Sequence, residues 1–164
     1  MKNIILTIFV LGLVFSCRPE FEDIGEPQGR SAGLSGTWNL LSVIQIDEKA
    51  VSKDYPDFVQ RINLTERAGF NTYQLVLNQN SEGSPTTFEE RDTDAPAIIG
   101  FESGSWELDD PEYPKEIIFT SDGGQQYSMT ISTYLGLAEG ELNLNFSRIV
   151  DGEPIVTYQY KFVK

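Results

Sequence analysis

Polar and apolar positions alternate regularly along the last third of the chain. Segments 127–131, 142–146 and 156–162 each place an apolar residue at every second position, with Ser, Thr, Asn, Gln or Lys between. A period of two is typical of a β-strand with one face in a dry core and the other in water. Turn signals at Asp122-Gly123-Gly124 and Asp151-Gly152 favour antiparallel hairpins between neighbouring segments.

The earlier part of the chain is less regular. We expect strands at 38–46, 73–77 and 105–108, and the weaker patterns at 86–90 and 97–101 add two further candidates. Strands do not alternate with long helical patterns, as they would in a parallel sheet. About eight strands in this arrangement predict an all-β antiparallel meander, closed into a barrel or folded as a sandwich.

Helical spacing occurs in only one stretch. Val51, Tyr55, Phe58 and Ile62 follow a helical period, but Pro56 interrupts it. Because proline is tolerated in the first turn of a helix and breaks its interior, we expect at most one short helix after Pro56.

The N-terminus has the organisation of a secretory signal. Lys2 precedes an apolar run of twelve residues, 4–15, whereas a membrane-spanning helix needs about 20. We interpret residues 1–16 as a signal peptide; the alternative is a buried N-terminal strand or helix. Residues 17–33 are rich in Pro, Gly and charge, which is typical of a flexible tether. Residues 34–164 then form one globular domain.

The residues around the single cysteine resemble a known motif. Val14-Phe15-Ser16-Cys17 is similar to the lipobox of bacterial lipoproteins. The resemblance implies that the Cys17 sulfur is diacylated and the new amine acylated, commonly with palmitate, so that the lipid on Cys17 is the membrane partner. Stable anchoring takes two or more chains. A free thiol after ordinary signal cleavage is the alternative.

The residues after Cys17 bear on the location. Arg18 replaces the Asp that retains some lipoproteins at the inner membrane, so the resemblance implies the outer membrane. The acidic stretch 20–23 resembles surface-export signals, and a solvated linker explains it equally well. The periplasmic and cell-surface faces both remain open.

Composition narrows the chemistry. The chain has no His, one Cys and a net charge of −13. These counts exclude His-based nucleophilic catalysis, His-ligated metals and an internal disulfide, and the charge opposes a nucleic-acid partner. Asp92-Thr93-Asp94 matches only the start of a calcium loop. We predict no metal site and no cofactor, and the oligomeric state stays open.

A Gly-x-Trp motif indicates the type of barrel. Gly36-Thr37-Trp38 opens the first expected strand and, with the meander, resembles the lipocalin-like (calycin) proteins; Gly104-Ser105-Trp106 repeats the pattern. The resemblance implies an eight-stranded antiparallel up-and-down barrel in which the Trp plugs the base and a late basic side chain packs on the indole. Arg148 has the strand parity for that role, and Lys161 is the alternative.

An eight-stranded barrel either fills with side chains or holds one small ligand. The favoured function is non-enzymatic binding of a small apolar or amphipathic ligand in an apolar cup with phenol hydroxyls. The alternative is a packed core with tyrosines at its rim. The candidate ligand-binding residues are Tyr73, Tyr127, Met129, Tyr158 and Tyr160.

Two other functions remain open. A protein- or glycan-interaction module would gather exposed aromatic residues into one patch, with Phe88, Phe101, Tyr113 and Tyr134 as candidates. A small hydrolase would need two carboxyl groups about 5–10 Å apart in a cleft. The acidic clusters fall in expected turns, where acids are usually solvated; they are Asp47-Glu48, Glu89-Glu90, Asp92, Asp94, Asp109-Asp110 and Glu112.

Overall fold

The computed structural model describes residue 31 and residues 33–67, 69–91 and 95–164. The predicted signal peptide, Cys17, most of the tether and the calcium-loop fragment at 92–94 lie outside the described residues. Within them, no helix is long and apolar enough to cross a membrane.

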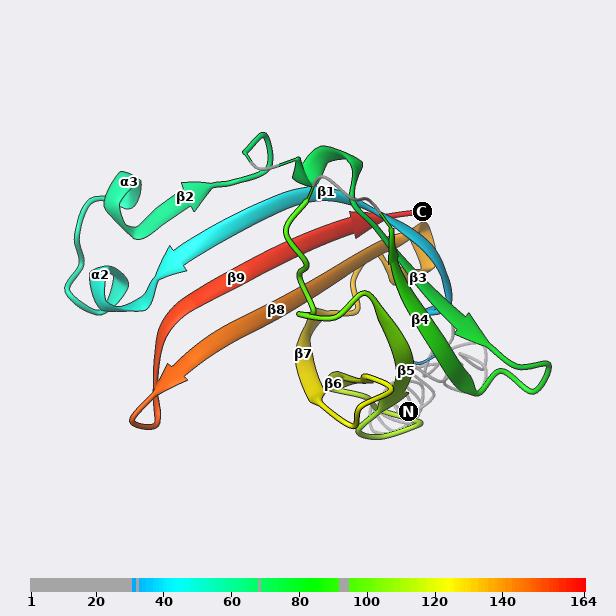
Figure 1. Cartoon of the computed structure of the whole chain (residues 1–164). Coiled ribbons are helices and arrows are strands. Elements are labelled where there is room, and N and C mark those ends of the chain that lie inside the picture. The colour runs from blue at the N-terminus through cyan, green and yellow to red at the C-terminus, as the bar shows by residue number, and fades with distance from the viewer. Residues whose placement is uncertain (1–30, 32, 68, 92–94) are drawn as a thin grey trace, which may run out of the picture.

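The described residues form one antiparallel sheet that closes on itself (Figure 1). Eight of its nine strands follow one another around a barrel in chain order, and the last pairs with the first, while β2 lies outside on β1. The predicted eight-stranded up-and-down barrel is therefore confirmed. The strands are β1 (Gly36–Asp47), β2 (Arg61–Asn63), β3 (Gln74–Gln79), β4 (Pro85–Arg91), β5 (Ser103–Leu108), β6 (Glu116–Thr120), β7 (Gln126–Thr133), β8 (Glu141–Val150) and β9 (Glu153–Val163).

Short helices lie between the strands. The helix expected after Pro56 is confirmed as α3 (Asp57–Gln60), whereas α2 (Glu48–Ser52) was not predicted. The side chain of Asp47 caps α2 by accepting a hydrogen bond of 2.9 Å from the Ala50 amide. The described residues also contain the 3₁₀ helices η2 (Phe70–Thr72) and η3 (Leu137–Glu139).

Three strands extend beyond the barrel. A bulge between Leu40 and Ser42 lets β1 leave β3 and continue beside β9, and the β8–β9 hairpin runs alongside. Its turn places Asp151 and Gly152 at φ values of 53° and 83°, as a two-residue hairpin turn requires. Together with α2, α3 and β2, these distal strand ends (residues 43–63 and 146–158) form a projection that we call the arm (Figure 1).

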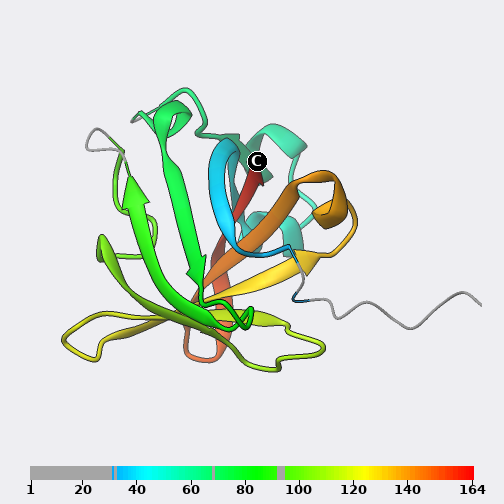
Figure 2. The ribbon, with the colours of Figure 1, turned by 90° about the vertical axis from the view of Figure 1, so that its right-hand side faces the viewer.

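The prediction of a strand at 97–101 is wrong. These residues form the loop between β4 and β5, which buries Ile98 and Ile99 against the core. Pro96 has no amide hydrogen for a strand ladder, and Gly100 adopts a φ of 85°. β3 and β4 lie on one side of the barrel and β7 and β8 on the other (Figure 2).

Trp38 closes one end of the barrel, which we call the base. Its side chain is fully buried, and its indole Nε1 donates a hydrogen bond of 2.7 Å to the Leu34 carbonyl. The cation on the indole is Lys164, whose Nζ lies 4.5 Å from the ring centroid. A side chain at Gly36 would come within 3.1 Å of Lys164 Cε, so the Gly-x-Trp motif leaves room for this lysine.

The prediction that Arg148 packs on Trp38 is therefore wrong. Arg148 pairs with Val156 near the tip of the arm and is exposed, because β8 runs several residues past the barrel wall. Lys161, the alternative, forms an ion pair of 2.9 Å with Glu141 instead. The strand parity assigned to Arg148 was right, but its distance along the strand places it outside the barrel.

Candidate ligand site at the tyrosine end of the barrel

The end of the barrel opposite the base carries a group of aromatic side chains around one carboxylate. We call it the tyrosine end, and the β4–β5 loop and the β6–β7 turn border it. Five strands or their ends supply it, because the register brings the start of β3, β7 and β9 to the same end of the barrel as the finish of β4 and β8. The residues are Tyr73, Glu90, Tyr127, Phe146, Tyr158 and Tyr160.

Glu90 is fixed within this group by two hydrogen bonds. Its Oε1 accepts one of 2.5 Å from the Tyr73 hydroxyl and one of 2.7 Å from the Ile99 amide. The first bond joins β4 to the residue before β3, and the second holds the β4–β5 loop over the barrel. Glu90 therefore organises this end of the barrel from the inside.

The aromatic rings pack as a connected series across neighbouring strands. Tyr127 stacks on Phe146 with ring centroids 4.5 Å apart. Tyr158, Tyr160 and Phe162 stack along β9 at 6.3 and 6.4 Å, and Tyr73 meets Phe162 at 6.3 Å. Contacts of this geometry add to the stability that burial provides and hold the rings in place.

Burial and the neighbouring carboxylate change the ionisation of the group. Burial, and then Glu90, raise the pKa of Tyr73. Burial also raises the pKa of Tyr127 and of Tyr160, with Glu90 adding to both shifts. Burial likewise raises the pKa of Glu90, although its hydrogen bonds oppose the shift. One carboxylate thus acts electrostatically on three phenols, which remain neutral hydrogen-bond donors at physiological pH.

A cavity of about 430 Å³ adjoins Tyr73 and Glu90. Its size falls within the range of small-molecule sites, about 300–1,000 Å³. Arg91 on its wall is already paired with Glu89, through an ion pair of 2.9 Å. The full lining is Tyr73, Glu89, Glu90, Arg91, Ala95, Ala97 and Glu102.

The structure brings four of the five predicted ligand residues together and places the fifth apart. Tyr127 and Tyr158 are half-buried, and Tyr73 and Tyr160 are buried beside them. Met129 lies one layer deeper, 1% exposed, in the same packed cluster as Trp38. The barrel below the tyrosines is filled by side chains, as the packed-core alternative expects for that region.

Glu90 is the residue that sequence reasoning missed. It was grouped with Glu89 as a solvated turn acid, but it lies in β4 and points to the same face as Phe88, which is 1% exposed. The alternation of Thr86, Phe88 and Glu90 carried that signal. The strand is short and its inward-facing position carries a charge. The pair Glu89-Glu90 was therefore interpreted as a solvated pair of acids in a turn.

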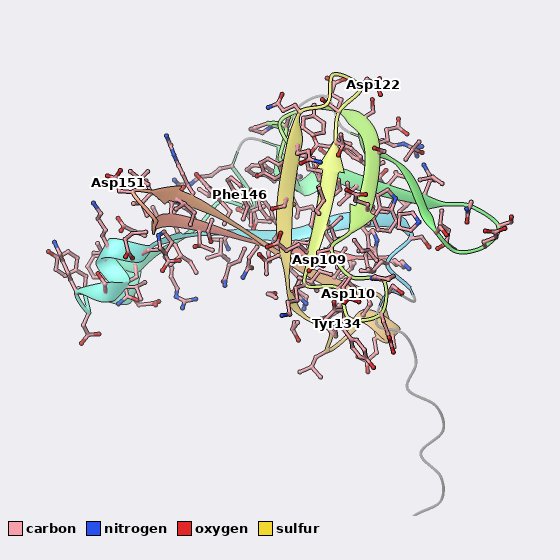
Figure 3. The ribbon with its side chains drawn as sticks, turned by 90° about the horizontal axis from the view of Figure 1, so that it is seen from below. Asp109, Asp110, Asp122, Tyr134, Phe146 and Asp151 are labelled. Atoms are coloured by element: carbon pink, nitrogen blue, oxygen red, sulfur yellow. The ribbon has the colours of Figure 1, made fainter. Side chains whose placement is uncertain are left out.

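Among the other acids that were candidates for hydrolysis, Asp47 and Glu48 lie in the arm, and Asp109, Asp110 and Glu112 lie between β5 and β6. Asp92 and Asp94 lie outside the described residues. Asp109 and Asp110 lie at the end of the barrel opposite Asp122, while Asp151 marks the tip of the arm (Figure 3). Asp109 Oδ1 accepts hydrogen bonds from the Lys115 and Glu116 amides, which lower its pKa. Within the described residues, no three acids group as a metal site would require. Glu89 and Glu90 share the cavity beside Tyr73 with Glu102, whereas Asp109 and Asp110 do not line it.

The prediction of a patch of exposed aromatic residues is wrong for two of the four candidates. Phe88 is buried, and Phe101 packs edge to face on it with ring centroids 5.8 Å apart. Exposed apolar residues gather instead on α2, α3 and β2 of the arm, where Phe58 is 80% exposed. The others there are Val51, Tyr55, Val59 and Ile62.

A family model described as a domain of unknown function (DUF5004) matches residues 16–163. No curated protein matches the chain. The match covers the whole barrel and begins one residue before Cys17.

Proposed function

The chain belongs to the DUF5004 family of unknown function, and we propose that it is a lipid-anchored envelope protein that binds a small amphipathic molecule. The proposed site is the tyrosine end of its lipocalin-like barrel. The observation that carries the proposal is the cavity of about 430 Å³ beside Tyr73 and Glu90. Its volume falls within the range of small-molecule sites, and its lining combines charged groups with one ring and two small apolar residues, as suits an amphipathic molecule.

The chemistry of the site supports binding without catalysis. The phenols of Tyr73, Tyr127 and Tyr160 have raised pKa values, so they stay protonated near neutral pH and do not supply a phenolate base. No histidine is present in the chain to serve as a general base near neutral pH. The site thus offers apolar ring faces for a tail and hydroxyls to orient a polar head.

The anchor supports a location at the outer membrane. The lipobox-like Val14-Phe15-Ser16-Cys17 and the absence of Asp after Cys17 favour it, and the family match includes the tether. A net charge of −13 would repel the domain from anionic headgroups, so the acyl chains on Cys17 rather than the barrel surface would hold it there. Both faces of that membrane stay open.

The direct test is calorimetric titration of the mature chain with a neutral single-chain amphiphile, monolauroylglycerol, below its aggregation concentration. We expect saturable binding at one site. Tyr73→Ala should weaken it about tenfold, since Tyr73 lines the cavity and the loss of its ring contact with the probe costs about 1.4 kcal/mol. The matched control is Tyr55→Ala, an exposed tyrosine on the arm, which should leave affinity unchanged. Absence of saturable uptake, or equal losses in both variants, would overturn the proposal.

A second candidate, an interaction module, is favoured by the apolar residues of the arm. The arm contains six acids and four bases, so eleven of the thirteen net negative charges lie elsewhere. A nearly neutral surface with exposed apolar residues on a strongly acidic protein fits a partner protein with an apolar docking face.

Photo-crosslinking in cells tests the arm. A photoreactive side chain at Phe58 should give one reproducible adduct, which Val59→Ser on the same helix should diminish. The control is Leu135, which is 83% exposed but lies beside η3 on the barrel. Equal labelling from both positions, or none from Phe58, would count against this candidate.

A further inference from the structure

The carboxylate of Glu90 has no basic partner among the described residues. The nearest basic residue in sequence, Arg91, is paired with Glu89. The charged group that acts on Glu90 is another acid, Glu102, which raises its pKa further. The site as described has a negative charge and no counter-ion. Because a charge removed from water is costly unless it is paired, a positively charged ligand would stabilise the site.

The hydrogen bonds that Glu90 accepts come from neutral donors. Its carboxylate is bonded by the Tyr73 hydroxyl and by the backbone amides of Ile98 and Ile99. These bonds orient the carboxylate but leave its negative charge without a positively charged partner among the described residues.

The surroundings of Glu90 suit a positive charge. Aromatic faces attract cations, and organic ammonium ligands are commonly held by several rings. Tyr73 lines the cavity beside Glu90, and its hydroxyl is bonded to the carboxylate. A cation beside Glu90 would therefore have both a carboxylate and an aromatic ring next to it.

The cavity wall also favours a positively charged ligand. Its charged lining consists of three glutamates and one arginine, and that arginine is already neutralised by Glu89. The whole chain adds a net charge of −13. Fields of this sign concentrate cations near the opening and repel fatty acids and other anionic amphiphiles.

We propose that the tyrosine end selects amphipathic molecules whose head is an organic cation, a protonated amine or a quaternary ammonium group. Glu90 is the counter-ion of the head, the ring of Tyr73 on the cavity wall contacts it, and the tail lies towards Ala95 and Ala97. This inference rests on the proposed ligand-binding function and adds the charge of the ligand.

Three probes with the same twelve-carbon tail test the inference by calorimetry at low salt. They are dodecyltrimethylammonium, neutral monolauroylglycerol and anionic dodecanoate, each below its micelle concentration. We expect the cation to bind at least about tenfold more tightly than the neutral probe, since a desolvated cation–π contact alone contributes about 2 kcal/mol. Dodecanoate should bind more weakly than both.

The variant Glu90→Gln should remove the preference for the cation and retain binding of the neutral probe. The Gln side-chain oxygen still accepts hydrogen bonds from Tyr73 and Ile99, so the loop keeps its support. The control is Glu107→Gln, which removes the same charge from an exposed position of β5. It should keep the preference.

The outcomes separate the two proposals. Equal binding of cation and neutral probe by the native chain would overturn this inference and leave the proposed function standing. A preference that survives Glu90→Gln would overturn it too. Failure of all three probes to bind would overturn both. Comparison of probes on the native chain needs no variant and therefore decides the matter even where Glu90→Gln does not fold.

Discussion

The ammonium group of Lys164 lies 4.5 Å from the ring centroid of Trp38, and its Nζ donates a hydrogen bond of 2.6 Å to the Gly33 carbonyl. Trp38 begins the first strand of the barrel, and Lys164 follows the last strand directly. These are the two strands whose pairing closes the barrel. The contact thus joins both ends of the barrel chain at the base.

We predict that Lys164→Met lowers the free energy of unfolding by about 1–2 kcal/mol, the sum of a cation–π contact and a charged hydrogen bond. Urea denaturation of the mature chain measures this. Lys164→Arg should retain most of the stability. Arg148→Met serves as the control and should change it by less than about 0.5 kcal/mol, because Arg148 is exposed on the arm. A larger effect at Arg148 would contradict the assignment.

The fold could be predicted from sequence where strands have one wet face. The alternation in 142–146 and 156–162 fixed two strands and their inward residues, and both hairpin turns were read correctly. Short strands flanked by buried loops were harder: Ile98 and Ile99 are apolar like strand residues, but they belong to a loop held by Glu90. An apolar residue indicates burial, but it does not indicate whether the backbone is hydrogen-bonded in a strand or lies in a loop.

The site was predicted in its aromatic part and missed in its charged part. Tyr127, Tyr158 and Tyr160 share the parity of core residues, so alternation placed them inside. Glu90 shares the parity of Phe88, but a charge at an inward position contradicts a simple dry face. Its partners, Tyr73 and Ile99, lie 17 and 9 residues away in opposite directions. Such long-range contacts cannot be read from local periodicity.

Gly104 allows a close approach between β5 and β6. A Cβ atom there would lie 2.1 Å from the Thr120 carbonyl oxygen, which is backbone and cannot move aside. We predict that Gly104→Ala destabilises the barrel by at least about 1–3 kcal/mol, the range for overpacked positions. Thermal denaturation measures the change.

Gly123 provides the matched control in the next turn. A Cβ there meets only the Ser121 hydroxyl, at 3.8 Å, so Gly123→Ala should change stability by less than about 0.5 kcal/mol. Similar losses for both variants would show that the approach of β5 to β6 is not the reason for glycine at 104.

The anchoring proposal predicts that Cys17→Ala releases the protein from membranes into the soluble fraction. Without acyl chains, the acidic domain has no attraction for an anionic bilayer. Fractionation and immunoblotting detect the shift, and mass spectrometry of the native chain should find acyl mass on a peptide that begins at Cys17. Ser16→Ala, a neighbouring small-to-small change, should stay in the membrane fraction. A native peptide with an unmodified sulfur would contradict the proposal.

Ionisation of Glu90 should make the barrel less stable as the pH rises. Burial raises the pKa of Glu90 above the ordinary value of 4.5, so the folded state holds the proton more tightly than the unfolded state does. Stability supplied by the protonated carboxyl is therefore complete below pH 4.5 and is lost as the pH rises through the raised pKa.

The variant Glu90→Gln cannot ionise and should lack this loss. Urea titrations of both proteins from about pH 4 to pH 8 should give free energies of unfolding that diverge in favour of the variant and then run parallel. Glu107→Gln, the exposed control, should follow the native curve. Divergence in the opposite direction would mean that Glu90 is stabilised as an anion, as it would be with a cation already bound beside it.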